Sequence, residues 1–326
     1  MQKIFWWTIF VIGWIVIISK AEEELSVGFY SKTCPSAERI VRTSVAKAVA
    51  QDPGQAAGII RLHFHDCIVG GCDGSILLDS IPGVNSDFDM ERHSPGKPLL
   101  RGFQIIDDAK SKLESRCPQT VSCADILAFA ARDSVLATGA FSYAVPAGRR
   151  DGRVSNGSAV FANVPPITPN ITLLKHHFES RGLSLQDMVA LSGAHSVGFA
   201  PCGAFAGRLY FFNATVETDP SLDPEFAAFL KSKCPKGRFD GTADLDNVTP
   251  DRLDVQYYVN LKRKMGVLSS DQAMESDPLT AAAVRRYRNS RSLWMADFAT
   301  AMVKVGKMKV LAGTQGEIRT NCSALN

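Results

Sequence analysis

The stretch R-L-H-F-H-D-C, residues 61–67, places two histidines, an arginine, an aspartate and a cysteine within seven positions. Side chains of these types bind metal ions, transfer protons or stabilise a developing negative charge. The segment follows a Pro-Gly break and is apolar on one side, which predicts a helix. On a helix, Arg61 and His65 share a face with Phe64 beside them, whereas His63 points largely away. This arrangement favours an Arg/His pair over a two-histidine metal site, while a buried, hydrogen-bonded histidine is an equally good interpretation at this point.

The loop that follows, D-C-I-V-G-G-C-D-G-S, carries oxygen ligands in a short span. Asp66, Asp73 and Ser75 provide two carboxylates and a hydroxyl, and the tight glycine-containing turn leaves carbonyl groups free. Hard oxygen ligands of this kind suit Ca²⁺. Cys67 and Cys72 are placed to close the loop on itself. Turns rich in Asp and Gly are also common without any ion, so the loop alone leaves the calcium site open.

The first 21 residues predict a secretory signal peptide. Lys3 gives a positive start, residues 4–18 are almost entirely apolar, and Ser19-Lys20-Ala21 places small residues before a cut. An uncleaved membrane anchor is the alternative interpretation. Cleavage leaves 305 residues and lowers the formal net charge from +3 to +1. No later apolar run approaches the roughly 18 residues of a spanning helix. A nearly neutral chain gives no electrostatic footprint for nucleic acid, so we expect an exported protein that binds neither membranes nor nucleic acid.

Eight cysteines remain in the mature chain. An even number in an exported protein predicts four disulfides, and the absence of any C-x-x-C pair argues against a zinc–thiolate site. Spacing alone does not choose among the many possible pairings. Five N-x-S/T sequons are consistent with export, namely Asn156, Asn170, Asn213, Asn247 and Asn321.

Helical periodicity dominates the chain, and sustained alternation of period two is missing. A mature chain of this length exceeds a typical single core, so we expect two subdomains around a cleft. The irregular stretch 139–170, rich in Gly, Pro and Arg, is the expected seam between them. Helices are predicted from a Ser36 cap to Asp52 and over 56–67, 102–116, 122–137, 173–180, 224–232, 253–265 and 290–305.

Further motifs follow the first one along the chain. V-S-C-A-D occupies 121–125, G-R-R-D occupies 148–151, and M-V-A-L-S-G-A-H-S-V-G occupies 188–198. The segments 254–261 and 270–272 come later. The first stretch, residues 61–75, resembles the distal haem motif of class III secretory plant peroxidases. The later segments resemble, in order along the chain, the family's helix start, its turn, its proximal haem-ligand motif and its late calcium and aspartate segment. With all eight cysteines included, the resemblance covers nearly the whole mature chain.

The resemblance implies a mainly α-helical fold in which two subdomains hold one b-type haem between them. The distal subdomain is expected over 22–160 and the proximal subdomain over 161–326, with the final helix tied back to the distal half through Cys322. The resemblance also implies the cysteine pairs Cys34–Cys117, Cys67–Cys72, Cys123–Cys322 and Cys202–Cys234.

The same resemblance implies roles for residues of the haem pocket. His195 is the expected iron ligand, and Asp271 is the carboxylate that accepts from its far nitrogen and makes it a stronger donor. A neutral His65 is expected to move a proton of H₂O₂. Arg61 is expected to stabilise the charge that develops as the O–O bond breaks. Phe64 is expected to direct large substrates toward the haem edge.

Donor and calcium sites are implied as well. Pro165 matches the rim of the family's donor site, although Ile167 replaces the family's second proline there. Asn247 lies among proximal calcium ligands, so its sequon is expected to stay unused. The implied distal calcium ligands are Asp66, Val69, Gly71, Asp73 and Ser75, and the proximal ones are Ser196, Asp246, Thr249, Arg252 and Asp254.

The leading hypothesis is therefore a secreted, monomeric haem peroxidase of the apoplast or cell wall. It reduces H₂O₂ to water and oxidises phenolic-type donors by one-electron steps, with haem b and two Ca²⁺ as cofactors. Two other classes of protein are kept as alternatives. One is a zinc metallohydrolase that uses His63 and His65, which leaves His195 and Asp271 without a role. The other is a weakly active haem-binding wall protein.

One position departs from the family pattern. The family has an asparagine that accepts from the far nitrogen of the distal histidine, six residues after the glutamate that corresponds to Glu91. Here that count reaches Lys97, and a count back from the following R-G-F reaches Gly96, because the loop is one residue short. No asparagine occurs between Asn85 and Asn156. The usual acceptor is therefore missing from this loop.

We predict that Lys97→Asn speeds the reaction of the enzyme with H₂O₂. A charged lysine cannot accept a hydrogen bond, so either a backbone carbonyl or water must orient His65, or its catalytic nitrogen becomes less basic. Loss of such an outer partner costs roughly 10- to 100-fold in comparable sites. Stopped-flow rates decide the matter: an unmodified rate equal to that of ordinary family members, and unchanged by the substitution, would show that another acceptor replaces the asparagine.

Overall fold

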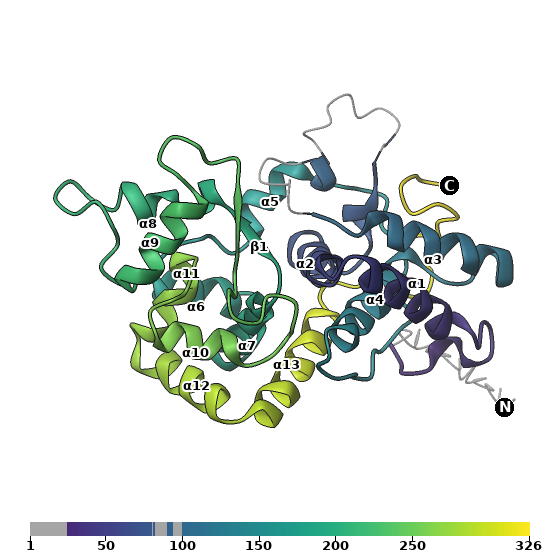
Figure 1. Ribbon diagram of the computed structural model, residues 1–326. Helices are drawn as coiled ribbons and strands as arrows, with labels where there is room; N and C mark the ends of the chain where they lie inside the picture. The colour runs from purple at the N-terminus through teal and green to yellow at the C-terminus, as the bar shows by residue number, and fades with distance from the viewer. Residues whose placement is uncertain (1–24, 80, 82–89, 94–99) are drawn as a thin grey trace, which may run out of the picture.

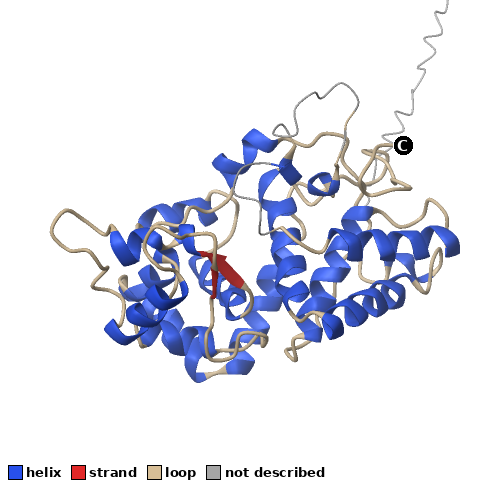
Figure 2. Cartoon of the chain, turned by 45° about the horizontal axis from the view of Figure 1, so that its top comes forward, coloured by secondary structure: helices blue, strands red, loops and turns tan. Residues whose placement is uncertain are grey.

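The computed structural model describes residues 25–79, 81, 90–93 and 100–326, and most of this chain is helical (Figure 1). The expected signal peptide 1–21 and Lys97 lie outside the described residues. None of the described helices is long and apolar enough to cross a membrane. Two short strands, β1 (Phe199–Pro201) and β2 (Thr242–Asp244), pair antiparallel (Figure 2).

The α-helices are α1 Ala37–Gln51, α2 Gly54–Val69, α3 Phe103–Arg116, α4 Cys123–Ala137, α5 Gly157–Asn163, α6 Ile171–Glu179, α7 Leu185–Ser192, α8 Ala206–Tyr210, α9 Pro224–Lys233, α10 Gln256–Lys262, α11 Ser269–Gln272, α12 Pro278–Asn289 and α13 Arg291–Val305. Short 3₁₀ helices lie at Phe29–Ser31, Ser75–Leu77, Glu91–His93, Gly193–Ser196, Cys202–Ala204 and Ala273–Glu275.

Each segment that the periodicity predicted as helical contains a helix, but several ends differ. The prediction over 253–265 shortens to α10 because the carboxylate of Asp254 accepts from the backbone N–H of Gln256 and holds the preceding residues in a turn. The expected capping role of Ser36 is wrong. Ser36 has helical backbone angles and its side chain makes no capping hydrogen bond, since the chain enters α1 from a preceding turn. The expected seam contains α5, which starts at the side-chain cap of Asn156.

The helices form two packed groups (Figure 1). Helices α1–α4 lie in one half of the molecule and α6–α12 in the other, with α13 between them. Helix α2 contributes to both groups, because Ile59 and Leu62 belong to one buried cluster whereas Ile60 belongs to the next. The core therefore continues across α2. The subdomain boundary at residue 160 stays a prediction.

Buried charges connect the end of the chain to the first half. The guanidinium of Arg149 pairs with Asp125 at 2.6 Å and donates to the carbonyl of Gly306, just past α13, at 2.8 Å. The carboxylate of Asp151 accepts from the backbone N–H groups of Cys123 and Ala124 at the start of α4. Buried ionic groups need partners of this kind. These contacts explain why V-S-C-A-D and G-R-R-D occur together.

The four disulfides agree with the pairs that the resemblance implies. Cys123–Cys322 joins residues 199 positions apart and ties the C-terminus to α4. The others are Cys34–Cys117, Cys67–Cys72 and Cys202–Cys234.

Helix α7 is anchored at both its start and its side. Ser184 and Asp187 form a reciprocal capping box at its N-terminus. The ammonium of Lys304 on α13 donates to the Asp187 carboxylate at 2.8 Å. Burial opposes ionisation of Asp187, but the hydrogen bonds from Lys304 and Ser184 outweigh it and hold its pKa below the ordinary 3.8. The segment that carries His195 follows directly after this helix.

We predict that Asp187→Asn lowers the free energy of unfolding by about 1–2 kcal/mol at pH 7, because the charge-assisted pair with Lys304 is lost and a neutral amide accepts more weakly from Ser184. A carboxyl whose pKa is lowered by folding contributes its stability above the unfolded pKa. The loss should therefore shrink as the pH falls through and below about 3.8. Denaturant unfolding at pH 7 and at low pH measures it.

Asp108→Asn is the matched control, because its pair with Lys112 is solvent-exposed within one helix and should contribute little. A loss for Asp187→Asn that is the same at both pH values would contradict the assignment to the ionised carboxylate.

Candidate active site

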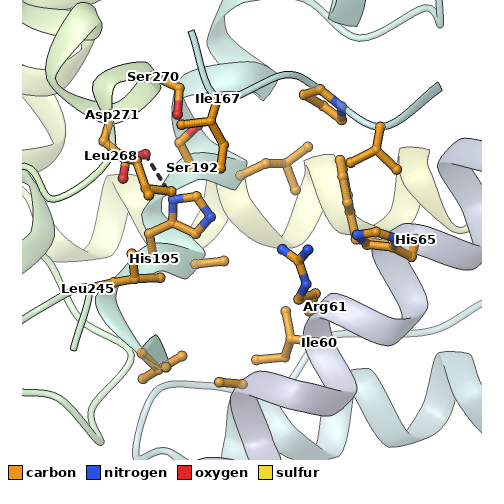
Figure 3. A pocket seen from close by; sticks show the side chains of 18 of the residues that line it. Ile60, Arg61, His65, Ile167, Ser192, His195, Leu245, Leu268, Ser270 and Asp271 are labelled. Atoms are coloured by element: carbon orange, nitrogen blue, oxygen red, sulfur yellow. Dashed lines mark hydrogen bonds and ion pairs between the residues drawn. The ribbon is translucent and has the colours of Figure 1, made fainter. Parts of the chain in front are cut away.

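A cavity of about 300 Å³ lies between α2 and the segment that follows α7. Figure 3 shows Arg61 and His65 of α2 facing His195 and Asp271 across it. Most other lining side chains are apolar, among them Ile60, Leu174, Leu245 and Leu268. A largely apolar cavity with a few convergent polar groups is typical of a site for a cofactor.

The α2 wall carries the expected Arg/His pair. Arg61 and His65 stand four residues apart and both line the cavity with Phe64. The Nε of Arg61 and the Nε2 of His65 are buried and have no hydrogen-bond partner among the described residues. Burial, together with the charge of Arg61, lowers the pKa of His65 to about 3. His65 is therefore neutral at ordinary pH and free to accept a proton.

His63 does not converge with His65. It lies buried on the other side of α2, with its Nδ1 3.7 Å from the Sγ of Cys67. Burial and the nearby charge of Arg149 lower the pKa of His63 to about 3. The two-histidine zinc site of the metallohydrolase alternative is therefore not supported by this geometry.

The opposite wall holds His195 in the short helix Gly193–Ser196. Its Nδ1 lies 2.8 Å from the Oδ1 of Asp271, so its Nε2 remains available to the cavity. Gly193 allows the segment to pass close to two aromatic side chains. A Cβ there would lie 2.5 Å from the hydroxyl of Tyr258 and 2.6 Å from the indole nitrogen of Trp294. Only glycine fits this approach without displacing them.

Tyr257 does not line the cavity but supports Asp271 of this wall, a role that sequence reasoning missed. Its hydroxyl donates to the Oδ1 of Asp271 at 3.0 Å, the same oxygen that partners His195. Burial and the charge of Asp271 raise the pKa of Tyr257 well above its ordinary value, so the phenol stays a donor. An aromatic residue inside a helical pattern predicts core packing, and no signal distinguished this one.

The rim of the cavity includes the predicted donor residue. Pro165 and Ile167 both line the cavity, and Ile167 is half exposed. The preceding Asn163 is held by α6, because its carbonyl lies 2.6 Å from the Nε2 of His177 and its side-chain oxygen accepts from Arg181 at 2.9 Å. This segment of the rim is therefore fixed to α6.

The predicted proximal calcium ligands converge. The hydroxyl of Ser196 lies 3.5 Å from Asp246, 3.4 Å from Asp254 and 2.9 Å from the carbonyl of Arg252. The hydroxyl of Thr249 lies 3.2 Å from Asp246 and 3.3 Å from Asp254. Two carboxylates, two hydroxyls and a carbonyl form a hard oxygen set of the kind Ca²⁺ prefers.

The predicted distal calcium loop gathers carboxylates in a buried place. The oxygens of Asp66 accept from the backbone N–H of Gly74 at 3.0 Å and of Ile76 at 3.3 Å. Burial and the charges of Asp73 and Glu91 raise the pKa of Asp66 well above its ordinary value. Glu91 was not among the predicted ligands.

A cation would relieve the repulsion among these distal carboxylates, so the loop fits the ion. The other predicted ligands here are Ser75, whose hydroxyl donates to Glu91 at 3.1 Å, and the backbone of Val69 and Gly71. Across the described ranges, no three His, Cys, Asp or Glu side chains are arranged to hold a metal ion by themselves. Either calcium site therefore depends on hydroxyl and carbonyl oxygens as well.

Comparisons with known proteins agree with this geometry. The family model described as peroxidase matches residues 41–290. The chain is 44% identical to Peroxidase 5 of Vitis vinifera, over 100% of this chain and 99% of that protein. It is 47% identical to Peroxidase 1 of Zea mays, over 96% and 86%, and 42% identical to Peroxidase 3 of Arabidopsis thaliana, over 97% and 96%. The chain therefore belongs to the peroxidase family, and within it to the class III plant peroxidases, which are haem enzymes.

Proposed function

We propose that this haem peroxidase activates H₂O₂ with Arg61 and His65 and oxidises small phenolic donors at the rim of the same cavity. The observation that carries the proposal is the arrangement across the cavity. A histidine already paired through Nδ1 with a carboxylate faces an arginine and a neutral histidine that have buried, unpartnered nitrogens. Such nitrogens cost stability unless a ligand completes them.

His195 would hold the haem iron through its Nε2. When bound, haem supplies the redox centre that accepts oxygen from H₂O₂ and takes electrons from the donor one at a time. The carboxylate of Asp271 accepts from the Nδ1–H and gives the imidazole more anionic character. Because Tyr257 donates to the same oxygen, part of that charge is drawn away, and the donor strength of His195 is set by both partners.

On the α2 wall, the neutral His65 and the cationic Arg61 have different roles. His65 is neutral and takes a proton from the peroxide oxygen nearest to it, then returns it to the departing oxygen, which leaves as water. The guanidinium of Arg61 stabilises the negative charge on the departing oxygen. A buried cation acts more strongly here than in water, since the surroundings screen it less. Phe64 covers the approach from α6 beside Phe178.

The donor site is proposed at the rim formed by Val164, Pro165 and Ile167. An exposed apolar edge next to the cavity suits a flat phenolic ring. Ile167 stands where the family has proline, so we propose that this edge is broader than in its relatives. We also propose export to the apoplast or cell wall, and a monomeric state. The apolar start of the chain and the disulfides support export.

We predict that His65→Gln lowers the rate with H₂O₂ by roughly 10²- to 10⁴-fold, because the proton acceptor is lost. The Soret band should remain, since His195 is untouched. His176→Gln, an exposed change on α6, is the control and should keep the full rate. A His65 variant that retains haem and reacts at the normal rate would rule out this role and favour the weakly active haem-binding alternative.

Calcium removal provides a second test. The two oxygen clusters contain the residues that directly follow His65 and His195 along the chain, Asp66 and Ser196. Chelation should therefore loosen both walls of the cavity and lower the activity and the melting temperature together. Adding Ca²⁺ back should restore both.

A matched pair of variants separates the proximal calcium cluster from general destabilisation. Asp254→Asn removes a carboxylate from that cluster, whereas Asp251→Asn changes an exposed neighbour. Only the first should lower the calcium content. An active protein without any calcium would show that both assignments are wrong.

A further inference from the structure

Arg101 lines the same cavity but has no role in the proposed chemistry. It stands just before α3, and its guanidinium carbon lies 4.3 Å over the ring of Phe199 in β1. The side chain therefore bridges the two halves of the molecule at the cavity wall. Its Nε is buried without a partner, and within the described part of the chain Arg101 makes no hydrogen bond or ion pair.

The position of Arg101 is fixed by close backbone packing against α2. A Cβ on Gly58 would lie 2.9 Å from the Cβ of Arg101 and 3.2 Å from its carbonyl oxygen. A Cβ on Gly54, one turn earlier, would lie 3.4 Å from a terminal nitrogen of Arg101. At Gly102, φ is +101° and a Cβ would lie 2.6 Å from Ile59. The glycines leave space that the arginine stem fills.

The nearby carboxylate of Asp52 does not satisfy this cation. One oxygen of Asp52 accepts from the backbone N–H of Gly54 at 3.0 Å, and the other accepts from the side chain of Gln55 at 2.7 Å. The guanidinium of Arg101, a planar group with several N–H donors, is thus left without a carboxylate partner among the described residues and stacks on the ring of Phe199. A group of this kind matches the two oxygens of a carboxylate.

We propose that Arg101 is a carboxylate anchor in the cavity wall and that the carboxylate is a propionate of the bound haem. This inference rests on the proposed haem site. The two propionates are the anionic side groups of b-type haem, and they need partners where the rest of the wall is apolar. Among the described residues, Arg61 and Arg101 are the arginines and lysines that line the cavity. Arg61 faces the iron ligand, which leaves Arg101 for the propionate.

The anchor would fix how the haem is turned within its own plane. His195 would hold the iron, and this single attachment would leave the ring free to turn about it. A bond from a propionate to Arg101, which itself rests on Phe199, removes that freedom. Arg101 is therefore a positioning residue and touches no reacting atom.

Haem release tests the proposal, with Arg101→Leu and Arg101→Lys compared with the unmodified protein. Transfer of haem to excess apomyoglobin should be roughly 10-fold faster for Arg101→Leu, since a hydrogen bond to a charged group is lost. Arg101→Lys should restore part of the retention. Arg92→Leu is the matched control: Arg92 lies 4.1 Å over Phe103 in the same way but does not line the cavity.

Haem dimethyl ester separates a propionate bond from packing. Proteins reconstituted with this haem should lose it at nearly the same rate whether residue 101 is Arg or Leu, because the carboxylates are gone. If Arg101→Leu speeds the loss of haem and of its dimethyl ester equally, the side chain acts only by packing on Phe199, and the proposal is wrong.

The carboxylate of a donor is the competing source. If haem release is unchanged but KM rises for a phenolic acid and not for the matching phenolic alcohol, Arg101 binds donors and the haem assignment is overturned. No change in either measurement also overturns it. Failure of the unmodified protein to bind haem at all would instead contradict the proposed haem site.

Discussion

The hydrogen bond between His195 and Asp271 joins residues 76 positions apart in the sequence. The packing of the helices in the second half of the molecule brings these two side chains together. His195 sits where α7 ends, and α7 is held by its capping box and by Lys304 of α13. Asp271 lies in α11 and also accepts from Tyr257 of α10. Three helices therefore converge on one carboxylate oxygen and one imidazole. In the proposed role of His195 as the iron ligand, its donor strength would therefore depend on how α7, α10 and α11 pack.

Much of the fold was predictable from the sequence because local signals control it. Helical spacing, the Pro-Gly break before α2 and the Ser122 cap of α4 each act within a few residues. The i, i+4 spacing placed Arg61 and His65 on one wall once α2 was recognised as a helix. At Ser36 the expected side-chain cap is absent, because a local backbone turn leads into α1 and Ser36 itself has helical angles.

The rest of the site was not predictable, because its roles depend on what a side chain faces. Tyr257 has the composition of a core residue and becomes a partner of Asp271 only when α10 packs beside α11. Glu91 joins the predicted calcium loop from outside the motif, through Ser75. Arg101 precedes an ordinary helix, and its position in the cavity wall is set by its packing against two glycines of α2 and a phenylalanine of β1. No spacing rule connects residues that meet only in the folded chain.

Several of the buried polar atoms that the described chain leaves unsatisfied gather at the cavity. Buried nitrogens of Arg61, His65 and Arg101 have no partner, and all three side chains line the cavity. Each unpartnered buried donor or acceptor costs about 1–3 kcal/mol, and apolar replacements of similar shape would avoid that cost. Folding alone therefore gives no reason to retain them. A chain keeps such groups where a bound molecule completes them, and their shared position at one largely apolar cavity indicates that a single ligand does so.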